Sequence, residues 1–156
     1  MARNVLLAHP VPDPARVIAR ICGSPGEVGL VLTGIALRQE KVSGGRIEEE
    51  RTYGGRPVSA LDEPVFIGSA IAQLAGHCDA VVVDRLATWV ERLLERFPDD
   101  PIERDAEIAS LVSVLQARMA DLVLVAGAPP ESAAARALFE RALAAVAENC
   151  EQRFAD

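Results

Sequence analysis

Four short runs of β-branched residues and leucine constrain the fold more than any other feature of this chain. They cover residues 4–8, 27–33, 80–83 and 122–125, and they lack the alternation of apolar and polar side chains that half-buried strands show. Continuous runs of this kind are typical of parallel strands that are covered on both faces. Segments with helical periodicity separate the runs, so the sequence predicts an α/β fold: a mostly parallel sheet with helices on both faces.

The helical segments are identified by apolar stripes in which residues recur at spacings of three and four. The clearest stripe, from Leu86 to Phe97, predicts an amphipathic helix that lies on the sheet. Two more stripes cover residues 108–119 and 138–150, and further helices are expected over 14–22 and 64–75. The remaining long segment, residues 41–60, has no clear period and contains four glycines, which predicts a surface excursion.

The composition indicates one domain, residues 1–156, with a negative net charge. Sixteen lysines and arginines stand against 23 aspartates and glutamates, a formal net charge of −7. Nucleic acids and anionic membrane surfaces require a basic face that this chain does not offer, so neither is expected as a partner. The longest uncharged apolar run, residues 28–37, is far shorter than the roughly 20 residues of a membrane-spanning helix. Three cysteines without paired spacing, and a start that lacks a signal-peptide pattern, predict a cytoplasmic protein.

The segment that follows the third run, Asp84-Arg85-Leu86-Ala87-Thr88-Trp89-Val90, resembles the Asp-Cys-Leu-Thr-x-Trp segment of the adenosylcobinamide kinase/adenosylcobinamide-phosphate guanylyltransferase family. Other segments resemble that family in the same order along nearly the whole chain: Arg56-Pro57, Asp62-Glu63-Pro64, residues 121–125, Pro130-Glu131, Arg136, Phe139 and Gln152-Arg153. The resemblance implies a P-loop fold of RecA-like topology. It also implies the family's activity, which is phosphorylation of cobinamide and then transfer of GMP to it in cobalamin biosynthesis.

The phosphate-binding loop of that family is missing from this chain. In the family this loop ends in Gly-Lys-Ser/Thr, and its amides and lysine hold the phosphates. Residues 8–16 are instead Ala-His-Pro-Val-Pro-Asp-Pro-Ala-Arg, with no glycine and no lysine. The three prolines have no amide hydrogen to donate, and Asp13 places a carboxylate where a phosphate would lie. We therefore expect the P-loop to be non-functional and ATP and GTP to bind poorly.

The covalent nucleophile that the family uses for GMP transfer is missing as well. In the family it is a histidine shortly before the Arg-Pro pair, and residues 45–53 contain no histidine. The resemblance therefore implies a chain without catalytic residues. No cofactor is expected either.

Two more departures from the family concern the end of the fourth strand and the end of the chain. The segment Ala126-Gly127-Ala128-Pro129 replaces the family's Asn-Glu-Val-Gly and removes polar groups from the expected site. Family members continue into another hydrophobic strand after their last helix, and this sequence ends at Asp156 without one. Because an uncovered sheet edge favours association, we expect a homo-oligomer or a protein partner, and the oligomers of the family support the same expectation.

Ligands of parallel α/β folds bind beyond the carboxyl ends of the strands. The residues expected there are His9, Thr33, Asp84 and Arg85, which mark a vestigial crevice for a small-molecule ligand. Three of them also have structural interpretations. His9 fits a plain loop residue, Asp84 a helix cap, and Arg85 a solvated partner of a nearby acid.

Four other residues are assigned to structure rather than to function. Trp89 and Cys150 lie on apolar stripes and are expected in the core. His77 and Cys78 are adjacent, but no second pair of cysteine or histidine residues lies at zinc-like spacing, so no metal site is predicted.

Three hypotheses of function follow from these residues. In the first, the chain is a degenerate member of the resembled family that keeps the scaffold, has lost nucleotide chemistry, and acts through binding as a regulatory or scaffolding subunit or a small-ligand carrier. In the second, it is an active cobinamide kinase/guanylyltransferase that holds phosphates with Arg16, Arg85 and Arg136. In the third, the resemblance is coincidental and the chain is an unrelated α/β interaction module.

Overall fold

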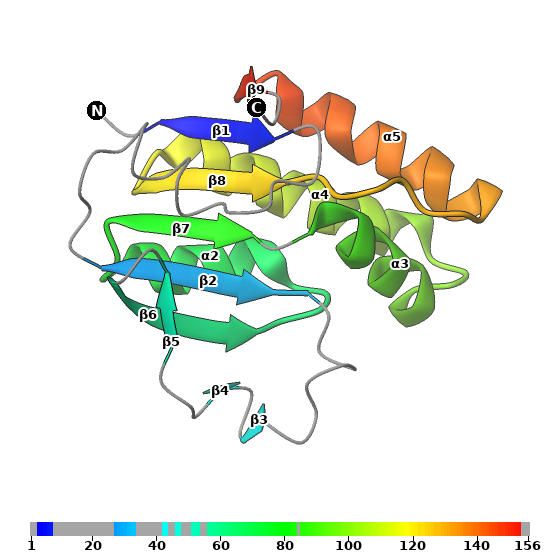
Figure 1. Ribbon diagram of the computed structural model, residues 1–156. Helices are drawn as coiled ribbons and strands as arrows, with labels where there is room; N and C mark the ends of the chain where they lie inside the picture. The colour runs from blue at the N-terminus through cyan, green and yellow to red at the C-terminus, as the bar shows by residue number, and fades with distance from the viewer. Residues whose placement is uncertain are drawn as a thin grey trace.

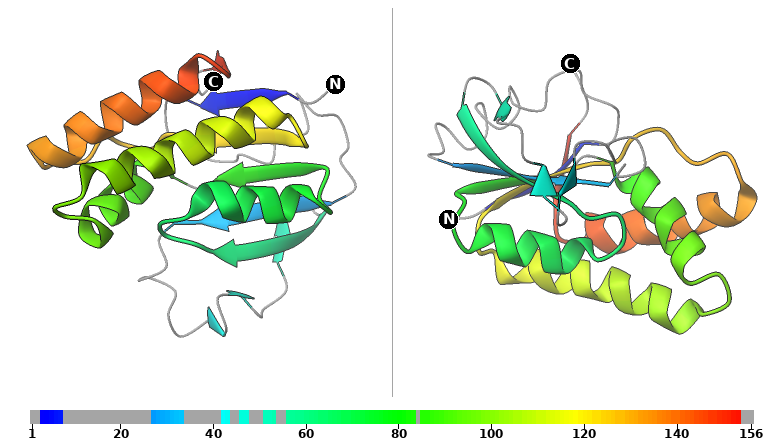
Figure 2. Two further views of the ribbon diagram at one scale, coloured as in Figure 1. Left: turned by 180° about the vertical axis from the view of Figure 1, so that it is seen from behind. Right: turned by 90° about the horizontal axis from the view of Figure 1, so that it is seen from below.

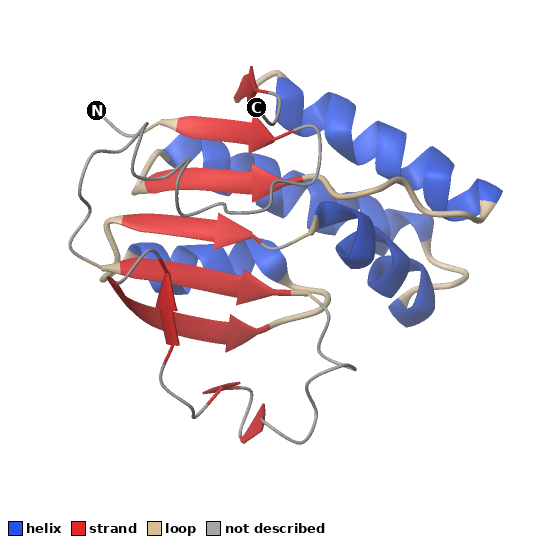
Figure 3. Cartoon of the chain, in the orientation of Figure 1, coloured by secondary structure: helices blue, strands red, loops and turns tan. Residues whose placement is uncertain are grey.

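The computed structural model describes residues 3–7, 27–33, 42–43, 46–47, 51–53, 56–83 and 85–153 (Figure 1). Its strands are β1 (Asn4–Leu7), β2 (Val28–Leu32), β3 (Val42–Ser43), β4 (Arg46–Ile47), β5 (Arg51–Tyr53), β6 (Arg56–Asp62), β7 (Ala80–Val83), β8 (Asp121–Val125) and β9 (Glu151–Arg153). Its helices are α2 (Ile67–Ala75), α3 (Leu86–Arg96), α4 (Pro101–Ala117) and α5 (Ala133–Ala147). All of the strands belong to one sheet (Figure 3).

The main part of the sheet is parallel. Its strands follow the order β6-β2-β7-β8-β1-β9, and every neighbouring pair in that order is parallel. The four apolar runs form β1, β2, β7 and β8, as predicted. β1 and β2 follow each other along the chain but are not neighbours in the sheet, because β8 and β7 lie between them. The predicted fold class, α/β with a mostly parallel sheet of P-loop-like, RecA-like topology, is confirmed.

Alternate residues of each central strand are buried on opposite faces of the sheet. Leu6 and Val81 belong to one buried cluster, together with apolar residues of α2, α4 and α5. Val5 and Val82 belong to a second cluster on the other face, and both are fully buried. Because both faces exclude water, the strands need no polar alternation.

The described helices α2, α4 and α5 all cover the same face of the sheet (Figure 2). The helix predicted over 14–22 lies outside the described residues. Within the described ranges, no helix is long and apolar enough to cross a membrane.

The amphipathic helix α3 does not lie on the sheet, so that prediction is wrong. It starts at the carboxyl end of β7 and extends beyond the strands, where it packs against α5 (Figure 1). Trp89 on its apolar stripe is fully buried, and the indole Nε1 donates a hydrogen bond of 2.7 Å to the carbonyl oxygen of Val65. An apolar stripe shows that one side of a helix is buried, but it does not show against what. In this structure α3 packs against another helix, α5.

The prediction for residues 41–60 also needs correction, because part of this segment extends the sheet. In β6, Val58 lies opposite Val28 and Asp62 lies opposite Leu32, in parallel register with β2. β4 and β5 then pair with β6 in antiparallel orientation. The sequence of β6 mixes polar and apolar residues and includes Pro57, so it lacks both the apolar run and the alternation that identify strands.

The sheet does not end at β1 either, contrary to the expectation of a missing last strand. β9 pairs with β1 in parallel, with Glu151 opposite Val5 and Arg153 opposite Leu7. The guanidinium of Arg3 contacts the Glu151 carboxylate through hydrogen bonds of 2.6–2.8 Å. Main-chain hydrogen bonds hold an edge strand, so its side chains can be polar. β1 is therefore not the uncovered sheet edge from which association was expected.

One buried polar side chain joins β1 to the helical layer. The amide nitrogen Nδ2 of Asn4 donates to the carbonyl oxygens of Leu115 and Asn149, at 2.8 and 3.0 Å. Asn4 itself is almost completely buried. These bonds satisfy main-chain groups at the end of α4 and after α5, where helix carbonyls lack intrahelical partners.

Candidate functional site

Two of the four residues predicted to mark the strand-end crevice are described by the structure. Thr33 follows β2 and Arg85 precedes α3, while His9 and Asp84 lie outside the described residues. The Thr33 hydroxyl donates a hydrogen bond of 3.0 Å to the main-chain carbonyl of Arg85. Thr33 is fully buried, so this bond holds the carboxyl ends of β2 and β7 together. The Arg85 side chain is exposed.

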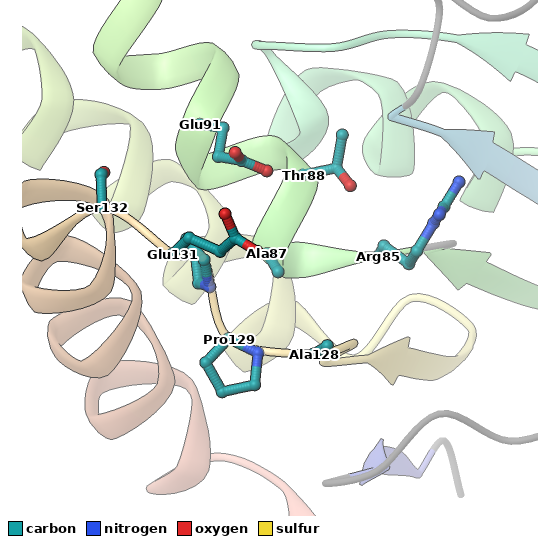
Figure 4. Close-up of a pocket in the computed structure, with 9 residues that line it drawn as sticks. Arg85, Ala87, Thr88, Glu91, Ala128, Pro129, Glu131 and Ser132 are labelled. Carbon is teal, nitrogen blue, oxygen red and sulfur yellow. The ribbon is translucent and has the colours of Figure 1, made fainter.

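A pocket of about 680 Å³ lies at the carboxyl ends of the neighbouring strands β7 and β8. One wall is the first part of α3, and the other is the segment between β8 and α5 (Figure 4). The lining residues are Arg85, Ala87, Thr88, Glu91, Ala128, Pro129, Pro130, Glu131 and Ser132. This is the region where a ligand was expected from the parallel fold, and the pocket includes Arg85 but not Thr33.

Main-chain contacts hold the two walls together. The amide of Ala87 in the first turn of α3 donates to the carbonyl oxygen of Ala126, at 3.0 Å. Gly127 has a φ of +80°, and a Cβ there would lie 3.4 Å from Cγ of Arg85. A larger residue at this position would therefore be strained by its backbone conformation. Gly127 thus lets the segment after β8 pass close to Arg85, next to the lining residue Ala128.

Two prolines reduce the number of main-chain hydrogen-bond donors that the segment between β8 and α5 can offer to a ligand. Pro129 and Pro130 have no amide hydrogen. The Ser132 hydroxyl caps α5 by accepting a hydrogen bond of 3.2 Å from the Ala135 amide. Ala128 and Pro129 form an apolar part of this wall.

The charges around the pocket do not favour a polyanion. Among the described lining residues, one arginine stands against two glutamates, Glu91 and Glu131, which gives a net formal charge of −1. In Figure 4 the guanidinium of Arg85 points away from both carboxylates. The amino end of α3 contributes a partial positive charge, and no acidic residue occupies its first turn. That partial charge, about half an elementary charge, is smaller than the net charge of −1 carried by the lining side chains.

Arg136, one of the arginines of the active-enzyme hypothesis, contacts the protein itself. Its Nε donates to the carbonyl oxygen of Pro130 at 3.2 Å, and its Nη2 donates to that of Glu131 at 3.4 Å. Arg136 therefore braces the segment before α5 and is not among the residues that line the pocket. The third arginine of that hypothesis, Arg16, lies outside the described residues.

Sequence reasoning missed a buried acid at the carboxyl end of β6. Asp62 is 5% exposed and lies in register with the end of β2. The following residue, Glu63, accepts hydrogen bonds from the amides of Val65 and Phe66, at 3.1 and 3.0 Å, and so satisfies donors before α2. The available signal was an acidic pair at the end of a strand and shortly before a helix, and it was not seen because β6 was not recognised as a strand.

The structural assignments of Trp89 and Cys150 are confirmed. Trp89 is fully buried, and Cys150 is partly buried and packs against the same core cluster. Burial raises the pKa of the Cys150 thiol to about 11, and the nearby Arg118 opposes this shift only in part. The thiol therefore stays protonated at neutral pH, as is typical of an unreactive structural cysteine.

A search of the sequence against models of protein families finds no match, and a search against curated proteins finds no match either, so the resemblance to the cobinamide kinase/guanylyltransferase family rests on the residues alone.

Proposed function

We propose that this chain is a non-catalytic binding protein, a degenerate relative of the adenosylcobinamide kinase/adenosylcobinamide-phosphate guanylyltransferase family that has lost nucleotide chemistry. It acts as a regulatory or scaffolding subunit or as a carrier of a small ligand. The observation that carries the proposal is the charge of the strand-end pocket, where Glu91 and Glu131 outnumber Arg85. A pocket with this lining suits a neutral or zwitterionic molecule better than a triphosphate.

The sequence of the segment after β1 also supports this proposal, and the loss of phosphate affinity that it implies can be given a magnitude. Residues 10, 12 and 14 are prolines, so three main-chain donors of a phosphate cradle are missing. A hydrogen bond to a charged group contributes about 1.5–3 kcal/mol. Three such losses remove about 4–9 kcal/mol from an affinity that, at micromolar Kd, totals only about 8 kcal/mol. Micromolar binding of ATP or GTP is therefore not expected.

Calorimetric titration of the full chain with GTP and with ATP, each with Mg²⁺, tests the proposal. The expected result is no saturable heat in the micromolar range. Arg85→Ala identifies whether any signal comes from the pocket, and Arg141→Ala is the matched control, because Arg141 forms an exposed ion pair with Asp105 away from the pocket. Micromolar affinity that Arg85→Ala weakens and Arg141→Ala does not would overturn the proposal.

A turnover assay separates this proposal from the active-enzyme hypothesis. The purified chain is incubated with adenosylcobinamide, labelled GTP and Mg²⁺, and the corrinoid is analysed for a transferred phosphoryl or guanylyl group. We expect neither product, because residues 8–16 contain no P-loop lysine and residues 45–53 contain no histidine that could accept the guanylyl group. Either product at a rate above that of the Arg85→Ala variant would establish the enzyme instead.

Self-association and a cytoplasmic location are further parts of the proposal. The resemblance to an oligomeric family supports the first, and the cysteine usage supports the second. Sedimentation equilibrium over a range of concentrations tests the first point, and a single species of monomer mass at all concentrations would exclude a stable homo-oligomer.

A further inference from the structure

Three side chains that can bind a metal ion lie together at the amino-terminal end of the sheet, opposite the strand-end pocket. Glu27 directly precedes β2, and His77 and Cys78 lie between α2 and β7. Their potential ligand atoms, one carboxylate oxygen, one imidazole nitrogen and the thiol sulfur, all lie within 4.8 Å of one another. The sequence did not reveal this group, because the third ligand, Glu27, lies just before β2 and far from His77 and Cys78 along the chain.

The main chain holds these three residues in place. The amides of His77 and Cys78 both donate to the carbonyl oxygen of Leu74, at 3.1 and 2.8 Å, which fixes the turn that ends α2. The Asp79 amide donates to the carbonyl oxygen of Glu27 at 2.9 Å, and the Asp79 carboxylate accepts from the Glu27 amide at 3.1 Å. The backbone positions of the candidate ligands are therefore set before any ion binds, which lowers the entropic cost of assembling a site.

The three candidate metal ligands differ in their exposure to solvent. Cys78 is only 5% exposed, and a Cβ at position 29 would lie 3.2 Å from its sulfur, so Gly29 leaves the space that the thiol occupies. His77 is exposed and Glu27 is half-buried. An ion can thus approach from the side of His77 and Glu27 and meet the thiol at the inner end of the site.

The donor set identifies the class of metal. Thiolate and imidazole ligands together suit Zn²⁺, whereas Mg²⁺ and Ca²⁺ take oxygen ligands. Three protein ligands plus one exchangeable position match zinc sites that keep a water molecule or an external ligand. We propose that Glu27, His77 and Cys78 form a Zn²⁺ site with a fourth position open to water or to an external donor.

Cobalt titration of the full, metal-free chain tests this proposal, because Co²⁺ bound to a thiolate gives a charge-transfer absorption that oxygen and nitrogen ligands do not give. The expected result is a band that saturates at one Co²⁺ per chain and disappears when Zn²⁺ displaces the cobalt. Cys78→Ser removes the band. The matched controls Cys22→Ser and Cys150→Ser keep it.

His77→Gln provides a second test that does not depend on a buried residue. Because His77 is exposed, this variant keeps the fold, which circular dichroism verifies. We expect its affinity for Zn²⁺, measured by competition with a chromophoric chelator, to fall at least about 10-fold, and Glu27→Gln to act in the same direction. The absence of a thiolate band, a band that survives Cys78→Ser, or an unchanged affinity of His77→Gln would overturn the proposal.

Discussion

The contact between α2 and α4 gives a prediction with a magnitude. Gly68, in the first turn of α2, lies directly against α4. A Cβ at this position would overlap the Ser110 hydroxyl oxygen and would lie 3.1 Å and 3.2 Å from the main-chain carbon of Ser110 and nitrogen of Leu111. Gly68→Ala therefore requires the two helices to move apart or the Ser110 side chain to rotate.

Two opposing terms determine the stability of Gly68→Ala. Overpacking a well-packed contact costs about 1–3 kcal/mol. Replacing glycine by alanine in a helix gains at most about 1 kcal/mol. The net expectation is a loss of about 1–2 kcal/mol in the free energy of unfolding, because part of the strain comes from the main chain of α4, which cannot rotate away.

A double-mutant cycle with Ser110→Ala, followed by urea unfolding, measures the contact. Ser110→Ala removes the atom closest to the new methyl group and is expected to change stability by less than about 0.5 kcal/mol alone. In the Gly68→Ala background it should restore at least about 0.5 kcal/mol, because the two residues touch. A Gly68→Ala variant that is as stable as the original chain or more stable, with no coupling to Ser110, would refute the close packing of α2 on α4.

Three other substitutions or conditions test single contacts. Trp89→Phe should lower the free energy of unfolding in urea by about 1–3 kcal/mol, because the carbonyl of Val65 loses its indole donor; an unchanged midpoint would contradict that bond. Asn4→Ala should lower the free energy of unfolding by a similar amount, about 1–3 kcal/mol, because the carbonyls of Leu115 and Asn149 lose their donor. An unchanged melting temperature would contradict a stabilising role of these two hydrogen bonds. The rate of alkylation of Cys150, measured by mass spectrometry, should rise with pH toward a midpoint near pH 11, because burial raises the pKa of the thiol to about 11. A midpoint near the ordinary thiol pKa of about 8.5 would contradict the buried position.

Much of the fold could be predicted from the sequence because the central strands are buried on both faces. Val82 and its neighbours in β7 leave no choice between helix and strand, since a four-residue apolar run with three consecutive valines is too short for a helix. The strands at the sheet margins follow other rules. Arg56–Asp62 pairs with β2, β4 and β5, and Glu151–Arg153 pairs with β1. Main-chain hydrogen bonds therefore hold both strands, and their side chains carry little pattern.

The candidate site could be predicted less completely, because it depends on distances between residues of different helices and strands. The spacing of apolar residues along the sequence does not give those distances. The sequence placed Arg85 at a strand end, and the structure puts it in the pocket wall. It did not indicate that Glu91 and Glu131 face the same space from different elements, nor that Glu27 lies beside His77. Such groupings arise from the order of strands in the sheet, which no local pattern specifies.

The most direct measurement of the central claim is an NMR titration of the ¹⁵N-labelled chain with GTP and Mg²⁺, followed at the amides of Arg85, Gly127 and Ser132. Arg85 and Ser132 line the strand-end pocket, and Gly127 directly precedes the lining residue Ala128, so these amides report on both of its walls. A pocket with a net negative lining predicts that none of them shifts in a saturable way. Saturable shifts at all three would show that the pocket binds nucleotide and would contradict the proposed loss of nucleotide chemistry.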